Sequence, residues 1–493
     1  MGAVVAASLA ARVFLAIDRP LWHDEVFTVW VSRLDIRQMI EVLRTDSGPP
    51  LFYLLEKPFV LAAEALHRSD KILRLLPLSA SVLLIAGYRT LADRKSRLLF
   101  VLLCATSPLL LLYAAEARTY ALLALLDFVL FFLGLRGRET WGRLVAAAAV
   151  TALTLFLHYI AILFVVAVAL VAIPLRRWRS LVAIGVGTAA FLPWLPILLH
   201  QPKDAISWMQ EPIGRSLVGF FSALGGSGRI PASLGTPVPG PFVAIGAVFA
   251  VFSLAGIVRP TRDVGAAAAC VLLTLSGILM LSLFRPIAFP GRSEMAVLPI
   301  WIWAVASAAQ TRRITRYGAL ATILLGTLSL VLLLVNSQRR NPTFVEALEA
   351  TKEWARPGDV LFAGPGFYLP ARLALDRGRL PLTLRAFPAD IADHPGWFLP
   401  VAPSSRDYAA VEQRLDETRD GERTFLLLHP YYLTSALLQT LRARGQTLAI
   451  LGRPDALLLL WTPEPLSHPQ ARPFAPEALR PEPERSRQPR AER

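Results

Sequence analysis

Two adjacent carboxylates, Asp24 and Glu25, are the first residues of this chain whose types suggest chemistry. They follow a short apolar segment and are preceded directly by Trp22 and His23. Carboxylates are costly inside the hydrocarbon of a bilayer and tolerated at its edge. A pair placed there could take a proton from a hydroxyl or hold a cation. The same residues also allow a structural interpretation, in which Asp24 caps an amphipathic helix over about residues 25–43 and Glu25 stabilises its first turn.

Four further stretches carry polar groups that could join this pair. Gly48-Pro49-Pro50 forces a turn before an apolar segment and is followed by Lys57, which is available to an anion. Glu116 and Arg118 lie between two apolar segments and are two residues apart, so on a helix they would point in different directions. We expect Arg118 to bind a phosphate and Glu116 to face Asp24 or a metal. A short polar hairpin is the alternative.

The other two stretches lie at the ends of apolar segments. His158 and Tyr159 end one of them, where the alternatives are ligands of an acceptor or metal and ordinary residues of the interfacial aromatic belt. Arg285 and Arg292 lie in a proline-rich loop. Arginine binds phosphate through two parallel hydrogen bonds and stays charged, so both are candidate phosphate ligands. We find no phosphate-binding glycine-rich loop, no paired-cysteine metal spacing, and no GxSxG or HExxH motif.

The composition is that of a protein with many membrane spans. Apolar residues make up 54% of the 493 residues, more than an ordinary soluble chain contains. The first apolar segment shows no cleavage pattern, so we expect it to be retained as an anchor. Cys104 and Cys270 lie in apolar segments and are interpreted as small hydrophobic residues. The formal charge of +15 indicates arginine-rich cytoplasmic loops, or anionic lipid headgroups or a phosphate-bearing substrate as partners. The scattering of the basic residues argues against nucleic acid.

The apolar segments predict an all-α polytopic membrane domain of about eleven spans over residues 1–338. The expected spans are 2–17, 72–92, 97–115, 119–135, 143–158, 160–175, 181–199, 241–258, 264–284, 295–310 and 317–336. Residues 51–66 are interrupted by Glu56-Lys57-Pro58 and are expected to lie in the interface. Five arginine-rich runs then fall on one side, as the positive-inside rule requires, and an outer loop over 18–71 carries Asp24 and Glu25.

The chain becomes less apolar after residue 338. Residues 343–355 and 432–443 have helical spacing, and 359–363, 424–428, 447–451 and 456–461 read as strands. Such alternation predicts a small soluble α/β domain over 339–465. The tail 466–493 is rich in proline, arginine and glutamate and is expected to be disordered.

Several of these stretches occur in an order that resembles a known family. They are Trp22-His23-Asp24-Glu25, Gly48-Pro49-Pro50-Leu51, Leu73-Arg74-Leu75-Leu76-Pro77, Ser107-Pro108 with Tyr113 to Tyr120, and His158-Tyr159. The order is similar to that of the bacterial polyprenyl-phosphate-sugar-dependent glycosyltransferases, which are C-type membrane glycosyltransferases akin to protein O-mannosyltransferases and lipid A aminoarabinose transferases. Gly48, Ala115 and Ser293 depart from the family pattern, in which His, Gln and Tyr are common.

The resemblance implies transfer of a hexosyl or pentosyl unit from a polyprenyl phosphate to a lipid, polysaccharide or protein acceptor. The site and the C-terminal domain would lie on the extracytoplasmic side of the bacterial inner membrane, among membrane lipids. Asp24 would be the base of an inverting displacement, assisted by Glu25, and Arg118, Arg292, Lys57 and Arg285 would bind the donor phosphate.

Glu116, His158 and Tyr159 would contact the acceptor or a metal. The one candidate cofactor is a divalent cation, Mg²⁺ or Mn²⁺, which the family does not use uniformly. A transporter or flippase of a lipid-linked glycan is the leading alternative, although the sequence lacks the inverted repeats of such proteins. A non-catalytic scaffold and a ligase using a diphosphate-linked donor are the others.

Overall fold

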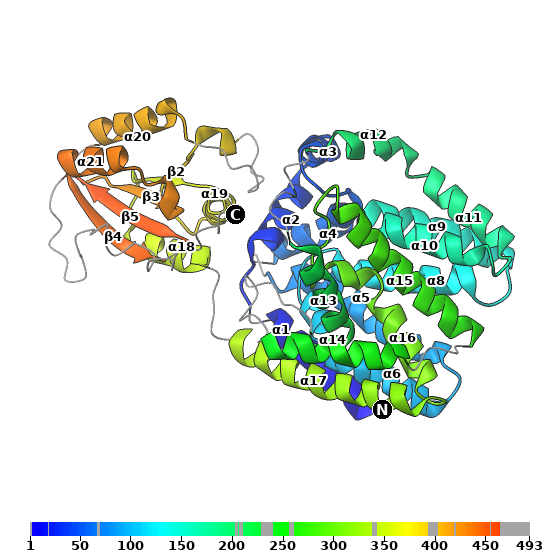
Figure 1. Ribbon diagram of the computed structural model, residues 1–493. Helices are drawn as coiled ribbons and strands as arrows, with labels where there is room; N and C mark the ends of the chain where they lie inside the picture. The colour runs from blue at the N-terminus through cyan, green and yellow to red at the C-terminus, as the bar shows by residue number, and fades with distance from the viewer. Residues whose placement is uncertain are drawn as a thin grey trace, which may run out of the picture. The chain divides into compact units, whose positions relative to one another are not determined.

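The protein consists of two compact units, Met1–Arg340 and Asn341–Arg493 (Figure 1). The computed structural model describes residues 2–17, 19–66, 70–202, 206, 211–227, 240–255, 261–337, 343–392, 403–418, 421–453 and 455–463. Within these ranges the first unit is built of helices, and the second unit contains a five-stranded sheet. The predicted disordered tail, 466–493, lies outside the described residues.

The first unit has seventeen α-helices in its described part, connected by short 3₁₀ turns. In chain order they are α1 (Gly2–Ile17), α2 (His23–Arg33), α3 (Ile36–Arg44), α4 (Leu51–Ala65), α5 (Leu75–Ile85), α6 (Arg94–Thr106), α7 (Pro108–Ala114), α8 (Tyr120–Leu135), α9 (Trp141–Leu157), α10 (Ile160–Ala172), α11 (Trp178–Ala189), α12 (Leu195–His200), α13 (Ile213–Leu224), α14 (Gly240–Ala255), α15 (Arg262–Ser282), α16 (Leu298–Ala308) and α17 (Arg313–Ser337). The 3₁₀ turns of this unit include η1 (Ile72–Arg74), η2 (Ala86–Thr90), η3 (Leu192–Trp194) and η6 (Ser293–Ala296).

Four stretches of the described chain are helical, long and apolar enough to cross a membrane: Ile72–Thr90, Trp178–His200, Arg262–Ser282 and Arg313–Val335. The bent pair α6 and α7 makes a fifth if it forms one span, and seven shorter apolar helices accompany them. The protein is therefore a multi-pass membrane protein, and the count of about eleven spans stays a prediction. The helix α4, which carries Glu56 and Lys57, belongs to neither group.

Small residues let the helices of this unit approach closely. A Cβ added to Gly225, which follows α13, would lie 1.8 Å from the carbonyl oxygen of Gly246 in α14. In α11, a Cβ on Gly187 would lie 2.3 Å from the carbonyl oxygen of Ala148 in α9. Helices α14 and α17 run side by side (Figure 1). Close approach of this kind is how helices associate in lipid, where the hydrophobic effect contributes little.

Three expectations about the helices were wrong. The single helix over about 25–43 is two helices, because the side chain of Asp35 accepts a hydrogen bond from Gln38 N at 2.9 Å and starts α3. The segment 97–115 is broken into α6 and α7, which meet at an angle of 64° at Pro108. The loop expected over 200–240 contains the apolar helix α13.

The second unit is a sheet in the strand order β2-β1-β3-β5-β4. Its strands are β1 (Val360–Ala363), β2 (Thr383–Ala386), β3 (Thr424–Leu428), β4 (Gln446–Gly452) and β5 (Leu457–Thr462). In β1, Val360 lies opposite Thr383 of β2 and Thr424 of β3 in parallel register, whereas β5 is antiparallel to β3 and β4. Its helices are α18 (Thr343–Trp354), α19 (Tyr368–Asp376), α20 (Ser405–Glu417) and α21 (Ser435–Arg444).

The core of this unit lies between the sheet and helices α20 and α21. Val411 and Leu415 of α20 and Leu437 and Leu441 of α21 pack with alternate strand residues around the buried Trp461. The predicted helices near 343–355 and 432–443 and the four predicted strands are confirmed. The sequence interpretation missed β2, α19 and α20.

Candidate active site

The carboxylate of Asp24 lies between two arginines that are far away in the sequence. Its Oδ2 is 3.3 Å from a terminal nitrogen of Arg118 and 3.4 Å from one of Arg292, and the side chain is 1% exposed. Neither oxygen of Asp24 has a hydrogen-bond partner among the described residues. The N-cap of α2 is Trp22, so Asp24 sits in the first turn and does not cap the helix. The structural interpretation of this residue was therefore wrong, and its carboxylate is left to the two guanidinium groups.

Aromatic rings surround both arginines. The guanidinium of Arg292 lies 4.7 Å from the ring centre of Phe289, 5.3 Å from that of Trp22 and 5.8 Å from that of Tyr120. Arg118 lies 6.0 Å from the same Tyr120 ring. Ring faces attract cations and exclude water, so they hold the two guanidinium groups without neutralising them. The positive charge stays available to an anion.

The loop that carries Arg292 is fixed by its own polar groups. Tyr113 Oη donates to the carbonyl of Gly291 at 2.5 Å, and Gly291 N donates to both carboxylate oxygens of Glu294 at 3.1 and 2.9 Å. Gly291 has a φ of 93°, which other residues rarely adopt. Burial raises the pKa of Glu294 to about 8, although the backbone N–H groups around it act in the other direction. Ser293 Oγ accepts from Phe289 N at 3.0 Å and closes the turn.

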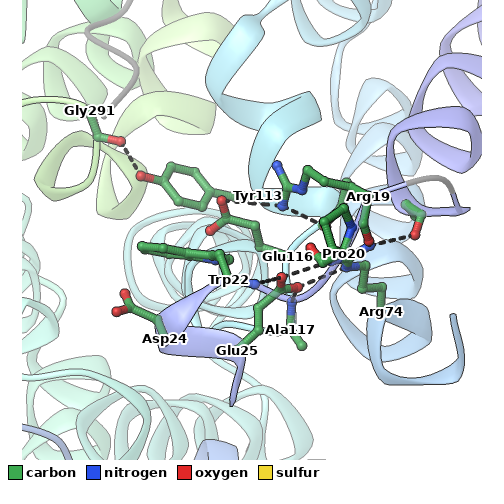
Figure 2. Close-up of polar contacts among 12 residues, drawn as sticks. Arg19, Pro20, Trp22, Asp24, Glu25, Arg74, Tyr113, Glu116, Ala117 and Gly291 are labelled. Carbon is green, nitrogen blue, oxygen red and sulfur yellow. Dashed lines mark hydrogen bonds and ion pairs between the residues drawn. The ribbon is translucent and has the colours of Figure 1, made fainter. Parts of the chain in front are cut away.

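Glu25 makes a different set of contacts from its neighbour. Arg74 donates to both of its oxygens, each at 2.8 Å, and Ala117 N and Trp22 N donate at 2.9 and 3.2 Å. Figure 2 shows Glu25 and Asp24 leaving the start of α2 in different directions. Burial alone would raise the pKa of Glu25, but the charge and hydrogen bonds of Arg74 outweigh it and lower that pKa. With its oxygens occupied, Glu25 is placed to hold the site together and not to take a proton.

Arg74 extends this anchor into the N-terminal segment. It donates to the backbone carbonyls of Arg19 and Pro20 at 2.7 and 3.1 Å (Figure 2), and to that of Ala16 at 2.8 Å. One buried guanidinium therefore joins the end of α1, the start of α2 and, through Glu25, the loop at Ala117. Arg74 belongs to one of the motifs of the sequence, but nothing in that motif indicates these contacts.

Glu116 is a second buried carboxyl at the site. Its Oε1 lies 3.5 Å from Arg19, which also donates to the carbonyl of Ala115 at 3.2 Å. Neither oxygen of Glu116 has a hydrogen-bond partner in the described structure. Burial raises the pKa of Glu116 to about 7, and the charge of Arg19 only partly opposes this. Among the described residues, no three His, Cys, Asp or Glu side chains gather to hold a metal ion.

His158, a predicted ligand of the acceptor or a metal, lies beside the ring that contacts both arginines. His158 packs against the Tyr120 ring at 5.5 Å and accepts from Ile160 N at 3.1 Å.

Three predicted residues form no contact with Asp24 in the described structure. Lys57 donates to the carbonyl of Leu34 at 2.6 Å, and Tyr159 accepts from Trp194 Nε1 at 2.9 Å. Arg285 forms no ion pair within the described residues, and its Nε lacks a hydrogen-bond partner there. The structure therefore brings Asp24, Arg118 and Arg292 together and does not bring in Lys57, Tyr159 or Arg285.

Comparisons with known proteins establish the fold. No family model matches the sequence, and no curated protein matches it. The structure is similar to two crystal structures of ArnT from Cupriavidus metallidurans, one in the apo state and one bound to undecaprenyl phosphate. The TM-scores are 0.58 and 0.56, with 12% sequence identity, over 93% of this chain and 97% of the other chain in both cases. This chain thus has the fold of ArnT.

The Arg74 anchor predicts an unusually large loss of stability for a conservative change. Arg74→Lys keeps the charge but cannot make two parallel bonds to Glu25 and three to carbonyls, so we expect a loss of about 3 kcal/mol. Arg33 is the matched control, since its pair with Glu64 is 22% and 32% exposed. Arg33→Lys should cost less than about 1 kcal/mol. Thermal unfolding of the detergent-solubilised protein measures both changes, and equal losses would contradict the anchoring role.

The raised pKa of Glu116 predicts a pH-dependent difference in stability. The folded protein holds this proton more tightly than the unfolded chain, whose pKa is about 4.5, so stability from this group is lost as pH rises from about 4.5 to about 7. Glutamine does not ionise, so Glu116→Gln removes this pH-dependent loss of stability. The variant should gain up to about 3 kcal/mol relative to the parent across this window and show a constant difference above it. A difference in unfolding temperature that does not change between pH 4.5 and 8 would refute the raised pKa.

Proposed function

We propose that this protein is a membrane glycosyltransferase that moves a sugar from a polyprenyl-phosphate donor to a lipid, glycan or protein acceptor. Two similarities support the class. ArnT is a lipid A aminoarabinose transferase and a C-type glycosyltransferase, and one of the two ArnT structures that are similar to this chain holds undecaprenyl phosphate. The motif order of this sequence resembles the same class. The observation that carries the proposal is the Asp24 carboxylate shared by Arg118 and Arg292.

The two arginines are suited to the phosphate of the donor. A phosphate monoester or diester oxygen accepts the same bidentate bonds as a carboxylate, and arginine stays charged while buried. When donor binds, Arg118 and Arg292 turn from Asp24 to the phosphate and stabilise the negative charge that develops on it as the sugar leaves. The exchange releases one oxygen of Asp24 for the acceptor.

The proposed reaction is a single displacement. The acceptor hydroxyl oxygen forms a bond to the anomeric carbon, the bond from that carbon to the phosphate oxygen breaks, and polyprenyl phosphate leaves with the electron pair. Asp24 takes the proton of the hydroxyl, and the anomeric centre is inverted. A carboxylate is a weak base for a hydroxyl, so much of the rate should come from positioning and from the arginines. A hexosyl or pentosyl unit, an extracytoplasmic site in the inner membrane and a divalent cation near Glu116 stay predictions.

Transfer by purified protein in proteoliposomes tests the proposal, once comparison of envelope glycans with and without the gene has identified the missing sugar. Asp24→Asn should lower kcat/KM by about a thousandfold, because the base is lost. Asp93→Asn is the control, since Asp93 caps α6 by accepting from Ser96 N and asparagine caps equally well. Arg118→Gln and Arg292→Gln should raise the donor KM, and Arg285→Gln should change it little.

Two results would overturn the proposal. One is full transfer activity in Asp24→Asn. The other is an unchanged glycan profile in the deletion strain with accumulation of a lipid-linked glycan on one leaflet, which would indicate the flippase.

A further inference from the structure

Arg12 is a buried cation in the apolar helix α1. It is 1% exposed, and among the described residues it is paired with no carboxylate. Its guanidinium donates to Ser81 Oγ at 2.8 Å, to the carbonyl of Cys104 at 3.1 Å, and to the carbonyl and hydroxyl of Ser8. An arginine at the centre of a membrane helix costs about 3 kcal/mol. The hydrogen bonds to these partners offset part of this cost, and one of the partners shows what Arg12 does.

The Cys104 carbonyl is an acceptor that the backbone cannot satisfy. In a continuous helix it would receive a hydrogen bond from the N–H four residues later. That residue is Pro108, which has no N–H. Here α6 ends at Thr106, α7 starts at Pro108, and the two helices meet at 64°. Arg12 therefore supplies the donor that the break removes.

The direction of α7 decides where part of the active site lies. Helix α7 leads directly into the loop 115–119, which carries Glu116 and Arg118. Its last turn holds Tyr113, whose hydroxyl fixes the Gly291 carbonyl in the Arg292 loop. Helix α1 packs against both α6 and α7. A change in the bend would move Arg118 away from Asp24, where the present distance is 3.3 Å.

We propose that Arg12 is a positioning residue of the transferase site. It holds the bend at Ser107-Pro108 by bonding the Cys104 carbonyl, and so keeps Arg118 opposite Asp24. Arg12 acts through Arg118 and touches no substrate. The inference rests on the proposed function, because Arg118 is there assigned to the donor phosphate.

A double-mutant cycle on the full-length protein in detergent tests it, with undecaprenyl phosphate as the probe. We expect Arg118→Gln to weaken binding of the probe by more than tenfold and Arg12→Met to weaken it by about tenfold. Because Arg12 works through Arg118, the double variant should bind the probe as weakly as Arg118→Gln alone, to within about threefold. Arg12→Lys retains one donor for the Cys104 carbonyl and should recover part of the affinity.

Arg143→Met is the matched control. Arg143 also donates to two backbone carbonyls, those of Phe132 at 2.6 Å and Arg136 at 2.7 Å, but at the end of α8 away from Tyr120. Its loss should leave probe binding unchanged and should not alter the Arg118→Gln effect. If Arg12→Met does not fold, as judged by circular dichroism and gel filtration, the cycle is run with Arg12→Lys, which loses the bonds that only a guanidinium can make.

The outcomes separate the two proposals. If the two losses of affinity multiply in the double variant, Arg12 acts independently of Arg118, and this inference alone is overturned. Wild-type affinity in Arg118→Gln would overturn the phosphate site and, with it, both proposals.

Discussion

Three closely placed charges that cannot all neutralise one another are the constraint on which the site depends. Asp24, Arg118 and Arg292 are each less than 20% exposed, and Asp24 is close to both arginines. One carboxylate faces two guanidinium groups, which repel each other, and each of the three ions also loses part of its hydration. The excess positive charge favours a further anion, which a phosphate donor would provide.

The scaffold around the trio compensates for this unfavourable arrangement. Glu25 and Arg74 form a buried pair in which the carboxylate receives four hydrogen bonds and the guanidinium also satisfies three carbonyls. Successive residues of a helix point about 100° apart. Glu25 therefore faces Arg74, and Asp24 faces Arg118 and Arg292, so the two adjacent acids make different contacts. Tyr113 joins the Arg118 side of the site to the Arg292 loop through the Gly291 carbonyl.

The sequence predicted site residues where charged side chains occur at the ends of apolar segments. The Asp24-Glu25 pair at the end of the first apolar segment and the arginines at the ends of later ones predicted the meeting of Asp24, Arg118 and Arg292. Strand and helix periodicity located most of the α/β unit. Residue type alone could not separate Arg292 from Arg285, since the difference lies in the turn that Gly291 and Glu294 make. It also could not show that Arg74 reaches Glu25, because that contact depends on how distant helices pack.

Breaks in helices were the other limit of the sequence interpretation. Pro108 lies inside a long apolar stretch, and a proline within a membrane helix can kink it or end it according to what its neighbours supply. Here Arg12 of another helix supplies the missing donor. Pro58, by contrast, lies inside α4, which continues through it. The difference between the two prolines is partly local, because Ser107 caps α7 with Pro108 at its start, and partly tertiary, because Arg12 bonds the Cys104 carbonyl.

The affinity of undecaprenyl phosphate for the wild-type protein and for Asp24→Asn tests the phosphate site most directly. If Asp24 occupies the two guanidinium groups in the absence of donor, its neutral replacement frees them, and we expect the variant to bind the lipid about tenfold more tightly. Weaker binding by Asp24→Asn than by the wild type would contradict the competition between carboxylate and phosphate.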